Sequence, residues 1–254
     1  MTLFNSIHVF LDEYLNIAKI ADDINAQNGL QLDARSIPAS QVNIIACGVD
    51  ASEDTIDAAI AAKAELLIVH HGLLWGGNRP LTGAHARKIA KCFKHELSVY
   101  AAHLPLDIHC EVGNNIEILR VLGLQAEKSF GCYHDIDLGY TAICDLSIDE
   151  LCQRINLQIG EYRLFGRGPY RIKRLAVISG GAGSYISAAA QAGLDALIVG
   201  EAPHYTAIEA DEQNIHLIVA GHYRTEVFGV RALGAKLAQQ FGINHIFVGN
   251  DTGL

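Results

Sequence analysis

The chain has 254 residues, half of them hydrophobic and 19% charged, which is an ordinary globular balance and enough chain for one large domain or two modest ones. Its net charge of −9 argues against a nucleic-acid-binding surface across the fold. A local basic strip at Arg163, Arg167, Arg171, Lys173 and Arg174 is interpreted as a solvated face in preference to a nucleic-acid contact.

The N-terminal twenty residues carry acidic side chains and no cleavage motif, and no apolar run is long enough to span a membrane. The six cysteines form no C-x-x-C pair. We therefore expect a soluble, cytoplasmic protein with reduced thiols and no membrane partner.

Apolar residues at 7–18 have helical spacing, and Val-, Ile- and Leu-rich runs alternate with helical patterns in the rest of the chain. This alternation predicts an α/β protein whose mixed sheet is covered on both faces, as three α/β/α layers. The predicted strands are 43–49, 65–69, 97–102, 174–179, 195–199, 216–220 and 245–248, and the predicted helices are 53–63, 84–95, 114–122, 147–158, 184–192 and 224–240.

An internal repeat changes the expected organisation. Residues 46–72 align with 176–202 at a constant offset, including "LIV" in both. Residues 99–107 align with 218–226, and each of these segments holds a His-x-x-x-carboxylate sequence. We therefore predict a duplicated α/β unit, with a first repeat at 1–125 and a second at 126–254 that includes a strand-helix-strand segment at 126–170.

Histidines and carboxylates follow several of the predicted strands. Ligands of α/β sheets bind at the carboxyl ends of strands, so these side chains converge if their strands lie together in the sheet. Imidazole with carboxylate is a ligand set for Zn²⁺, Mn²⁺, Fe or Co. The residues concerned are His70, His71, His103, Asp107, Glu201, His222 and Glu226.

Each signal has an ordinary explanation by itself. A lone histidine at a strand end is more often buried or capped than a ligand, and an i, i+4 His/Glu pair is usually a surface ion pair. Three strand ends carrying such groups together favour a metal site. Two ions bridged by a carboxylate, about 3.5–4 Å apart, would activate water for hydrolysis.

Two neighbouring features leave their alternatives open. The turn "SGGAGS" at 179–184 either cradles a phosphate or only makes a strand-to-helix turn. Trp75, the only tryptophan, either stacks on a ligand base or packs at a subunit contact.

Four segments together resemble one known family. They are "IVHHG" (68–72), "HLPLD" (103–107) followed by "GNN" (113–115), "QNGLQ" (27–31) and "AGHYRTE" (220–226). The set resembles the YbgI-like dinuclear metal-centre proteins, also called GTP cyclohydrolase I type 2-like or NGG-one-interacting factor three-like, over nearly the whole chain.

The resemblance implies two intertwined α/β repeats assembled as homohexamers and a centre of two divalent ions. Its metal ligands would be His70, His71, Asp107, His222 and Glu226. Glu226 would bridge, one ion would take His71 and Asp107, and the other would take His70 and His222. His103 and Glu201 would be the acid/base candidates.

Two function classes follow. The first is a metal-dependent hydrolase acting on a small molecule, either by opening the imidazole ring of GTP or by cleaving a phosphoester. The second is a non-catalytic protein that binds metal or a partner as a hexameric ring. Loss of turnover in His103→Ala with the metals retained would distinguish the enzyme from the carrier.

Overall fold

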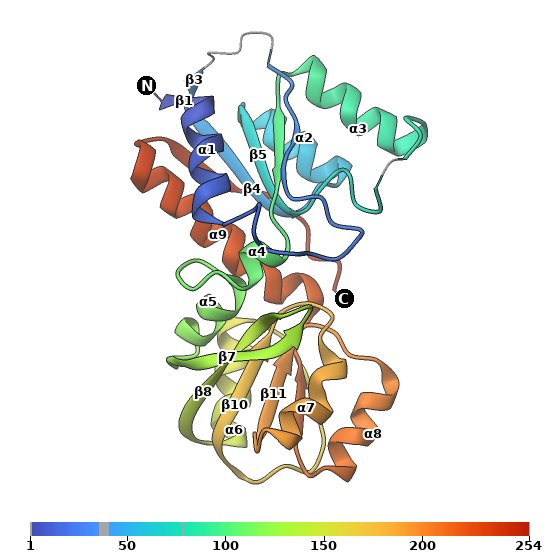
Figure 1. Ribbon diagram of the computed structural model, residues 1–254, viewed down its shortest axis with the longest axis vertical. Helices are drawn as coiled ribbons and strands as arrows, with labels where there is room; N and C mark the ends of the chain where they lie inside the picture. Colours follow the sequence, from blue (N-terminus) through green and yellow to red (C-terminus); the bar gives the residue numbers. More distant parts are fainter. Residues whose placement is uncertain (1, 36–40, 78, 254) are drawn as a thin grey trace. The chain divides into compact units, whose positions relative to one another are not determined.

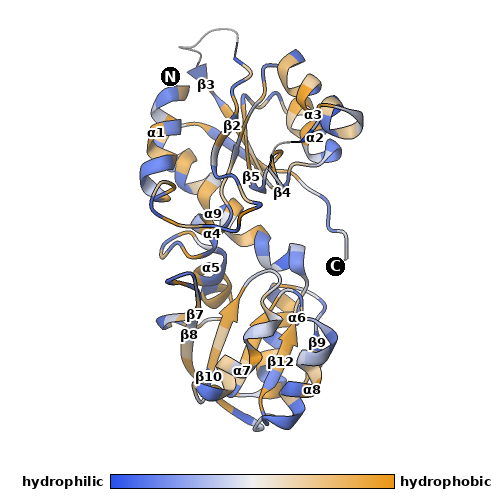
Figure 2. Cartoon of the chain, turned by 45° about the vertical axis from the view of Figure 1, so that its right-hand side comes forward, coloured by the Kyte–Doolittle hydropathy of each residue, from blue (hydrophilic) through white to orange (hydrophobic). Residues whose placement is uncertain are grey.

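The protein, described here from a computed structural model for residues 2–35, 41–77 and 79–253, is an α/β protein with two mixed sheets (Figure 1). It forms two compact units: unit 1 comprises Met1–Leu106 and Val230–Asn250, and unit 2 comprises Asp107–Gly229 and Asp251–Leu254. Figure 2 shows that hydrophobic residues concentrate on the strands of the sheets, as expected for strands buried on both faces.

Unit 1 is built on a five-stranded sheet with the order β13-β4-β5-β6-β2, in which only β2 is antiparallel to its neighbour. A second, two-stranded sheet pairs β1 with β3. The elements are β1 (Thr2–Leu3), α1 (Phe4–Tyr14), β2 (Gly29–Leu32), β3 (Gln41–Val42), β4 (Ile44–Asp50), α2 (Glu53–Ala61), β5 (Leu66–His71), α3 (Gly83–Lys94), β6 (Ser98–Ala101), β13 (Asn244–Phe247) and the C-terminal part of α9 (His222–Phe241).

Helices cover both faces of this sheet. Alternate residues of β5, Leu67 and Val69, belong to a core cluster with residues of α2 and α3. On the other face, the Tyr100 hydroxyl donates to Asp12 of α1 over 2.8 Å. Helix α9 comes so close to this face that a Cβ on Gly234 would lie 2.7 Å from Cys47 Sγ.

Unit 2 contains a six-stranded sheet with the order β7-β8-β10-β11-β12-β9, in which β10, β11 and β12 run parallel. The other neighbours pair antiparallel. The elements are α4 (Leu104–Asp107), at the unit boundary, α5 (Asn114–Val121), β7 (Ala126–Tyr133), β8 (Ile136–Ser147), α6 (Ile148–Gln158), β9 (Arg163–Phe165), β10 (Arg171–Ile178), the 3-10 helix η1 (Gly183–Tyr185), α7 (Ile186–Gln191), β11 (Ala196–Val199), α8 (His204–Glu212), β12 (His216–Val219) and the first turns of α9.

The core of unit 2 has the same layering. Leu175 and Val177 of β10 pack with α5 and α6 on one face. Ala176 and Ile178 of the same strand pack with α7 and α8 on the other. The expected three-layer α/β/α arrangement with a mixed sheet is therefore confirmed in both units.

The sheet register supports the predicted duplication. Ile45 pairs with Leu66, and Leu175 pairs with Ala196, so both partners shift by the same 130 residues (45 to 175, 66 to 196). Each sheet also continues through two further strands, of which the last is antiparallel: β6 and β2 in unit 1, β12 and β9 in unit 2.

The sequence alignment of residues 99–107 with 218–226 differs by one residue from the correspondence that strand pairing gives. Leu67 pairs with Val99, whereas its counterpart Leu197 pairs with Leu217, so Val99 corresponds to Leu217 rather than to residue 218. Gly221, with a φ of +95°, lies in the turn between β12 and α9, where the extra residue is accommodated.

The predicted division at 125/126 does not coincide with the compact units. Helix α5, from the predicted first repeat, packs in the core of unit 2. Strand β13, from the predicted second repeat, pairs with β4 in unit 1. The repeat boundary stays a prediction about the sequence.

The predicted strands and helices are present, with shifted ends. Both histidines of "IVHH" lie inside β5, although the sequence indicated that they follow the strand. The predicted helix at 184–192 is a 3-10 turn followed by a six-residue helix. Among the described residues, no helix is both long and apolar enough to cross a membrane.

The basic strip of unit 2 is partly neutralised by acidic neighbours, as a solvated charged face would be. The ion pairs are Arg171 with Asp145, Arg174 with Glu127, and Arg167 with Asp211.

Candidate metal site

Three histidines gather at the carboxyl ends of neighbouring strands in unit 1. His70 and His71 end β5, and His103 lies just after β6. One potential ligand atom from each imidazole lies within 4.8 Å of those of the other two. The ring centroid of His70 lies 4.8 Å from that of His71 and 4.9 Å from that of His103.

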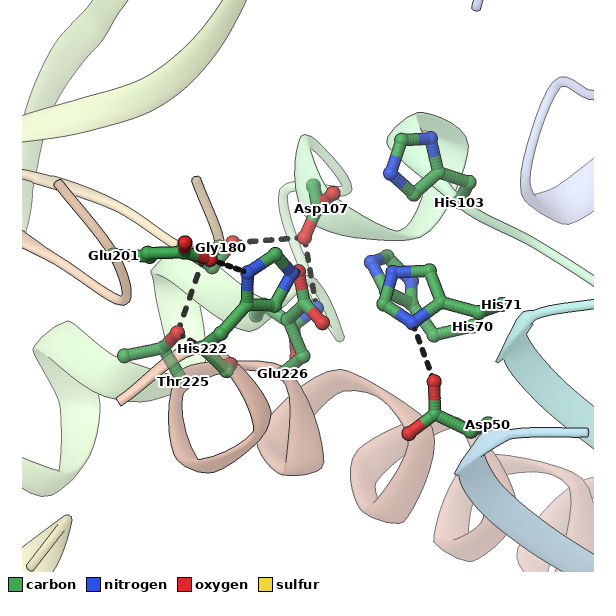
Figure 3. A network of polar contacts seen from close by, with 12 residues as sticks. Asp50, His70, His71, His103, Asp107, Gly180, Glu201, His222, Thr225 and Glu226 are labelled. Carbon is green, nitrogen blue, oxygen red and sulfur yellow. Dashed lines mark hydrogen bonds and ion pairs between the residues drawn. The ribbon is translucent and has the colours of Figure 1, made fainter. Parts of the chain in front are cut away.

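The Nδ1 atom of each of these imidazoles contacts an oxygen. Figure 3 shows the contact between His71 and Asp50. His70 Nδ1 lies 2.9 Å from the Ala102 carbonyl oxygen. Since a carbonyl oxygen can only accept, Nδ1 is the donor of this hydrogen bond. His71 Nδ1 lies 2.9 Å from Asp50 Oδ1. When Nδ1 donates in this way, a neutral imidazole carries its lone pair on Nε2, which is the typical state of a metal-bound histidine.

His103 is held in the same way by a more buried carboxylate. Its Nδ1 lies 2.7 Å from Asp22 Oδ1, and the Asp22 side chain is only 6% exposed. Burial alone would raise the pKa of Asp22, but the hydrogen bond and charge interaction with His103, followed by the hydrogen bond from Asn28, lower that pKa on balance.

Trp75 packs against two of these imidazoles. Its ring centroid lies 5.3 Å from that of His71 and 4.9 Å from that of His103, in edge-on geometry. The indole thus covers part of the cluster with apolar surface, which restricts water around the imidazoles.

Unit 2 holds the second group of candidate ligands, at the start of α9. His222 Nε2 lies 3.1 Å from Glu226 Oε1, and His222 Nδ1 lies 2.9 Å from Glu201 Oε2. The hydrogen bond with the buried Glu226 raises the pKa of His222 to about 9 despite partial burial, and Glu201 adds to the effect. A histidine with this pKa carries a positive charge between the two carboxylates at neutral pH.

Asp107 is fixed in the same unit by a buried amide and a hydroxyl. Asn114 Nδ2 and Ser179 Oγ each donate to Asp107 Oδ1 over 2.8 Å. Asn114 Oδ1 in turn accepts from the Gly229 N–H in α9, over 2.6 Å. The "GNN" segment therefore ties the Asp107 carboxylate to the helix that carries His222.

The glycine-rich turn after β10 serves protein contacts. The N–H groups of Ser179, Gly180 and Gly183 donate to Asn115, Thr225 and Glu201 respectively. Because these amides are already bonded, we do not assign the turn a phosphate. It instead allows a close approach: a Cβ on Gly180, at φ +66°, would lie 2.4 Å from Glu226 Oε1.

The donor set fits divalent metal ions in both units. Unit 1 offers imidazole nitrogens whose opposite ring nitrogens donate to oxygen. In unit 2, the proton of His222 Nε2 is shared with Glu226, and a cation replacing that proton would meet the same nitrogen and oxygen. His70, His71 and His103 form a group that could hold a metal ion, and His222 with Glu226 supplies a further imidazole and a carboxylate.

The sequence pattern indicates the imidazoles but not the groups that orient them. Asp22, Asp50 and the Ala102 carbonyl in unit 1 carry no recognisable spacing to their histidines. One signal was available: Asn28, inside the quoted "QNGLQ" segment, accepts from the His103 N–H over 2.8 Å.

Comparison with known proteins agrees with this fold. The structure resembles that of protein ybgI, of unknown function, with a TM-score of 0.89 and 31% sequence identity over 99% of this chain and 100% of the other. It also resembles TTHA1606 from Thermus thermophilus, with a TM-score of 0.86, 32% identity and full coverage of both chains. The protein is therefore an α/β protein of the ybgI-like fold with a histidine-rich candidate metal site.

Sequence comparison identifies the family. The profile of the Duf34/NIF3 (NGG1p interacting factor 3) family matches residues 2–253, and the chain belongs to that family. A protein of Pyrococcus horikoshii called "GTP cyclohydrolase 1 type 2 homolog" is 40% identical over 96% of this chain and 97% of its own. A Deinococcus radiodurans protein of the same name is 40% identical over 96% of this chain and 92% of its own.

Proposed function

We propose that the protein is a metal-dependent hydrolase with a centre of two divalent ions, Zn²⁺, Mn²⁺ or Fe²⁺. The ligands would be His70, His71, Asp107, His222 and Glu226, with Glu226 bridging. One observation carries the proposal: four imidazoles, those of the three ligand histidines and of His103, have Nδ1 against an oxygen.

Ions held by these ligands would supply Lewis-acid activation of water for attack on an electrophilic carbon or phosphorus. His103 and Glu201 are the acid/base candidates. We favour His103, because its imidazole lies beside those of His70 and His71 and would use Nε2 to take or give a proton. The Glu201 carboxylate already contacts His222 Nδ1, which makes it suited to orienting that imidazole.

The substrate class is proposed from the names of the relatives. Both relatives described above are called GTP cyclohydrolase 1 type 2 homologs, which favours a nucleotide whose imidazole ring is opened by water. A phosphoester is the competing substrate, because the same two ions would activate water toward phosphorus. We also propose a homohexamer, from the family resemblance, and light scattering of the purified protein tests it.

The test compares three proteins for turnover of GTP and of p-nitrophenyl phosphate, with metal content measured on the same samples. His103→Ala should keep its metals and lose about 100-fold or more of the turnover. His95→Ala, which alters an exposed histidine at the end of α3, should match the wild type. Equal turnover in all three would refute the proton role of His103. If no sample turned over either compound but all held metal, the non-catalytic metal-binding protein would be the better interpretation.

A further inference from the structure

The most completely bonded carboxylate beside the histidine cluster is that of Asp22, in the segment before β2. Each of its oxygens accepts two hydrogen bonds. Oδ1 accepts from the Asp23 N–H over 2.6 Å and from His103 Nδ1 over 2.7 Å. Oδ2 accepts from Asn28 Nδ2 over 2.7 Å and from the Leu104 N–H over 3.0 Å.

The identity of each donor follows from the network itself. The Asn28 side-chain oxygen accepts from the His103 N–H, so the nitrogen of the same amide must face Asp22. The two backbone groups, of Asp23 and Leu104, can only donate. His103 Nδ1 is therefore the one contact of Asp22 whose protonation the neighbours do not dictate, and an ionised carboxylate requires it to donate.

We propose that Asp22 is a positioning residue that holds His103 in the Nδ1–H tautomer, so that Nε2 carries the lone pair. The mechanism proposed above rests on that lone pair, and this inference goes one step further by naming the residue that creates it. Asp22 acts through His103 and has no assigned contact with a substrate or an ion.

Other contacts show why the segment around Asp22 can hold this orientation. The Asn25 carbonyl accepts from the Gly76 N–H over 2.8 Å, and Gln31 Oε1 accepts from the Leu74 N–H over 3.2 Å. The segment is thus bonded to the loop that carries Trp75, whose ring packs edge-on against His103. Backbone hydrogen bonds and ring packing together leave the imidazole little freedom to turn.

The Asp22→Asn substitution has a specific expected result, because an amide has one acceptor and one donor group where the carboxylate has two acceptors. If the amide nitrogen replaced Oδ2, it would face the Leu104 N–H and the Asn28 amide, and donors would oppose donors. If it replaced Oδ1, it would face the Asp23 N–H and His103 Nδ1, and the imidazole could relieve the conflict by moving its proton to Nε2. The substitution should therefore shift His103 to the Nε2–H tautomer.

The experiment is long-range ¹H–¹⁵N correlation spectroscopy of zinc-treated protein labelled with ¹⁵N-histidine, with the His103 signals assigned by their loss in His103→Gln. The wild type and Asp23→Asn should show His103 protonated on Nδ1, since Asp23 contacts Asp22 only through its backbone N–H. Asp22→Asn should show the proton on Nε2. Thermal denaturation of each variant confirms that it is folded.

The wild-type spectrum tests the proposal even if Asp22→Asn does not fold, because an Nε2–H tautomer or a doubly protonated imidazole there would overturn it. Retention of Nδ1–H in folded Asp22→Asn would also overturn it. Zinc bound to His103 Nε2 in the wild type would agree with the Asp22 assignment while removing the proton role of His103 in the proposed function. The two proposals therefore fail separately.

Discussion

Substitution of Gly180 by alanine adds one carbon atom, Cβ, beside the proposed ligand Glu226, and so tests whether the unit 2 cluster binds metal. The Gly180 φ of +66° is in the left-handed region, and a Cβ there would lie 2.4 Å from Glu226 Oε1, against about 3.4 Å for ordinary contact. In Gly180→Ala the carboxylate oxygen must therefore retreat by about 1.0 Å (3.4 − 2.4). Since Glu226 is buried and bonded to His222, this movement disturbs two proposed ligands together.

The chain offers a matched control in Gly193. Its φ is +69°, nearly the same conformation, but nothing lies within 4 Å of the position a Cβ would take. Alanine at either position costs about 1 kcal/mol of backbone strain. The free energy of unfolding should fall by about 1–2 kcal/mol more in Gly180→Ala than in Gly193→Ala, because Gly180→Ala also disturbs the His222–Glu226 hydrogen bond between charged groups.

The assays are denaturant unfolding and metal titration of both variants beside the wild type. Gly193→Ala should bind metal as the wild type does, whereas Gly180→Ala should bind it about 10-fold or more weakly, as expected when a ligand is displaced. If the two variants lost equal stability and both kept wild-type metal affinity, the reasoning that places Glu226 against Gly180 as a ligand would be refuted.

Three further outcomes are expected. Glu226→Gln should weaken the binding of both ions, because a bridging ligand contacts both. Binding of two full equivalents of metal at wild-type affinity would contradict the bridging role. Asp50→Asn should weaken metal binding by about 10- to 100-fold in an equilibrium titration, because Asp50 orients His71, and unchanged affinity would show that it does not. In chelator-treated protein, the pKa of His222 is raised from 6.5 to about 9, so its proton stabilises the fold fully below pH 6.5, and that stabilisation is lost as the pH rises through 9. Unfolding free energies measured across this range should fall in the wild type and stay flatter in His222→Gln; parallel curves would exclude His222 as the cause.

The sequence was most informative where a regular pattern and a physical constraint coincide. Strands buried on both faces need continuous apolar runs, so "ELLIV" and "DALIV" could be recognised as strands, and their shared offset predicted the equal register of the two sheets. The histidine positions followed from the same pattern, because strand ends are where α/β proteins place polar side chains.

The orienting groups could not be recognised because their partners are distant in sequence. Asp22 lies 81 residues from His103, and no periodicity relates them. The glycine turn was ambiguous for a related reason: its composition suits a phosphate, and only the fold shows its amides bonded to Asn115, Thr225 and Glu201. The single-residue slip at Gly221 also needed the sheet register, since a gap of one residue leaves no mark in the apolar pattern.

The most direct test of the metal centre is elemental analysis of protein purified without chelator or a nickel column, for the wild type and the His70→Ala/His71→Ala variant. We expect two equivalents of divalent metal in the wild type and their loss in the folded double variant. A wild type that holds no metal, even after reconstitution with zinc, manganese and iron, would contradict the metal centre and with it the proposed hydrolase.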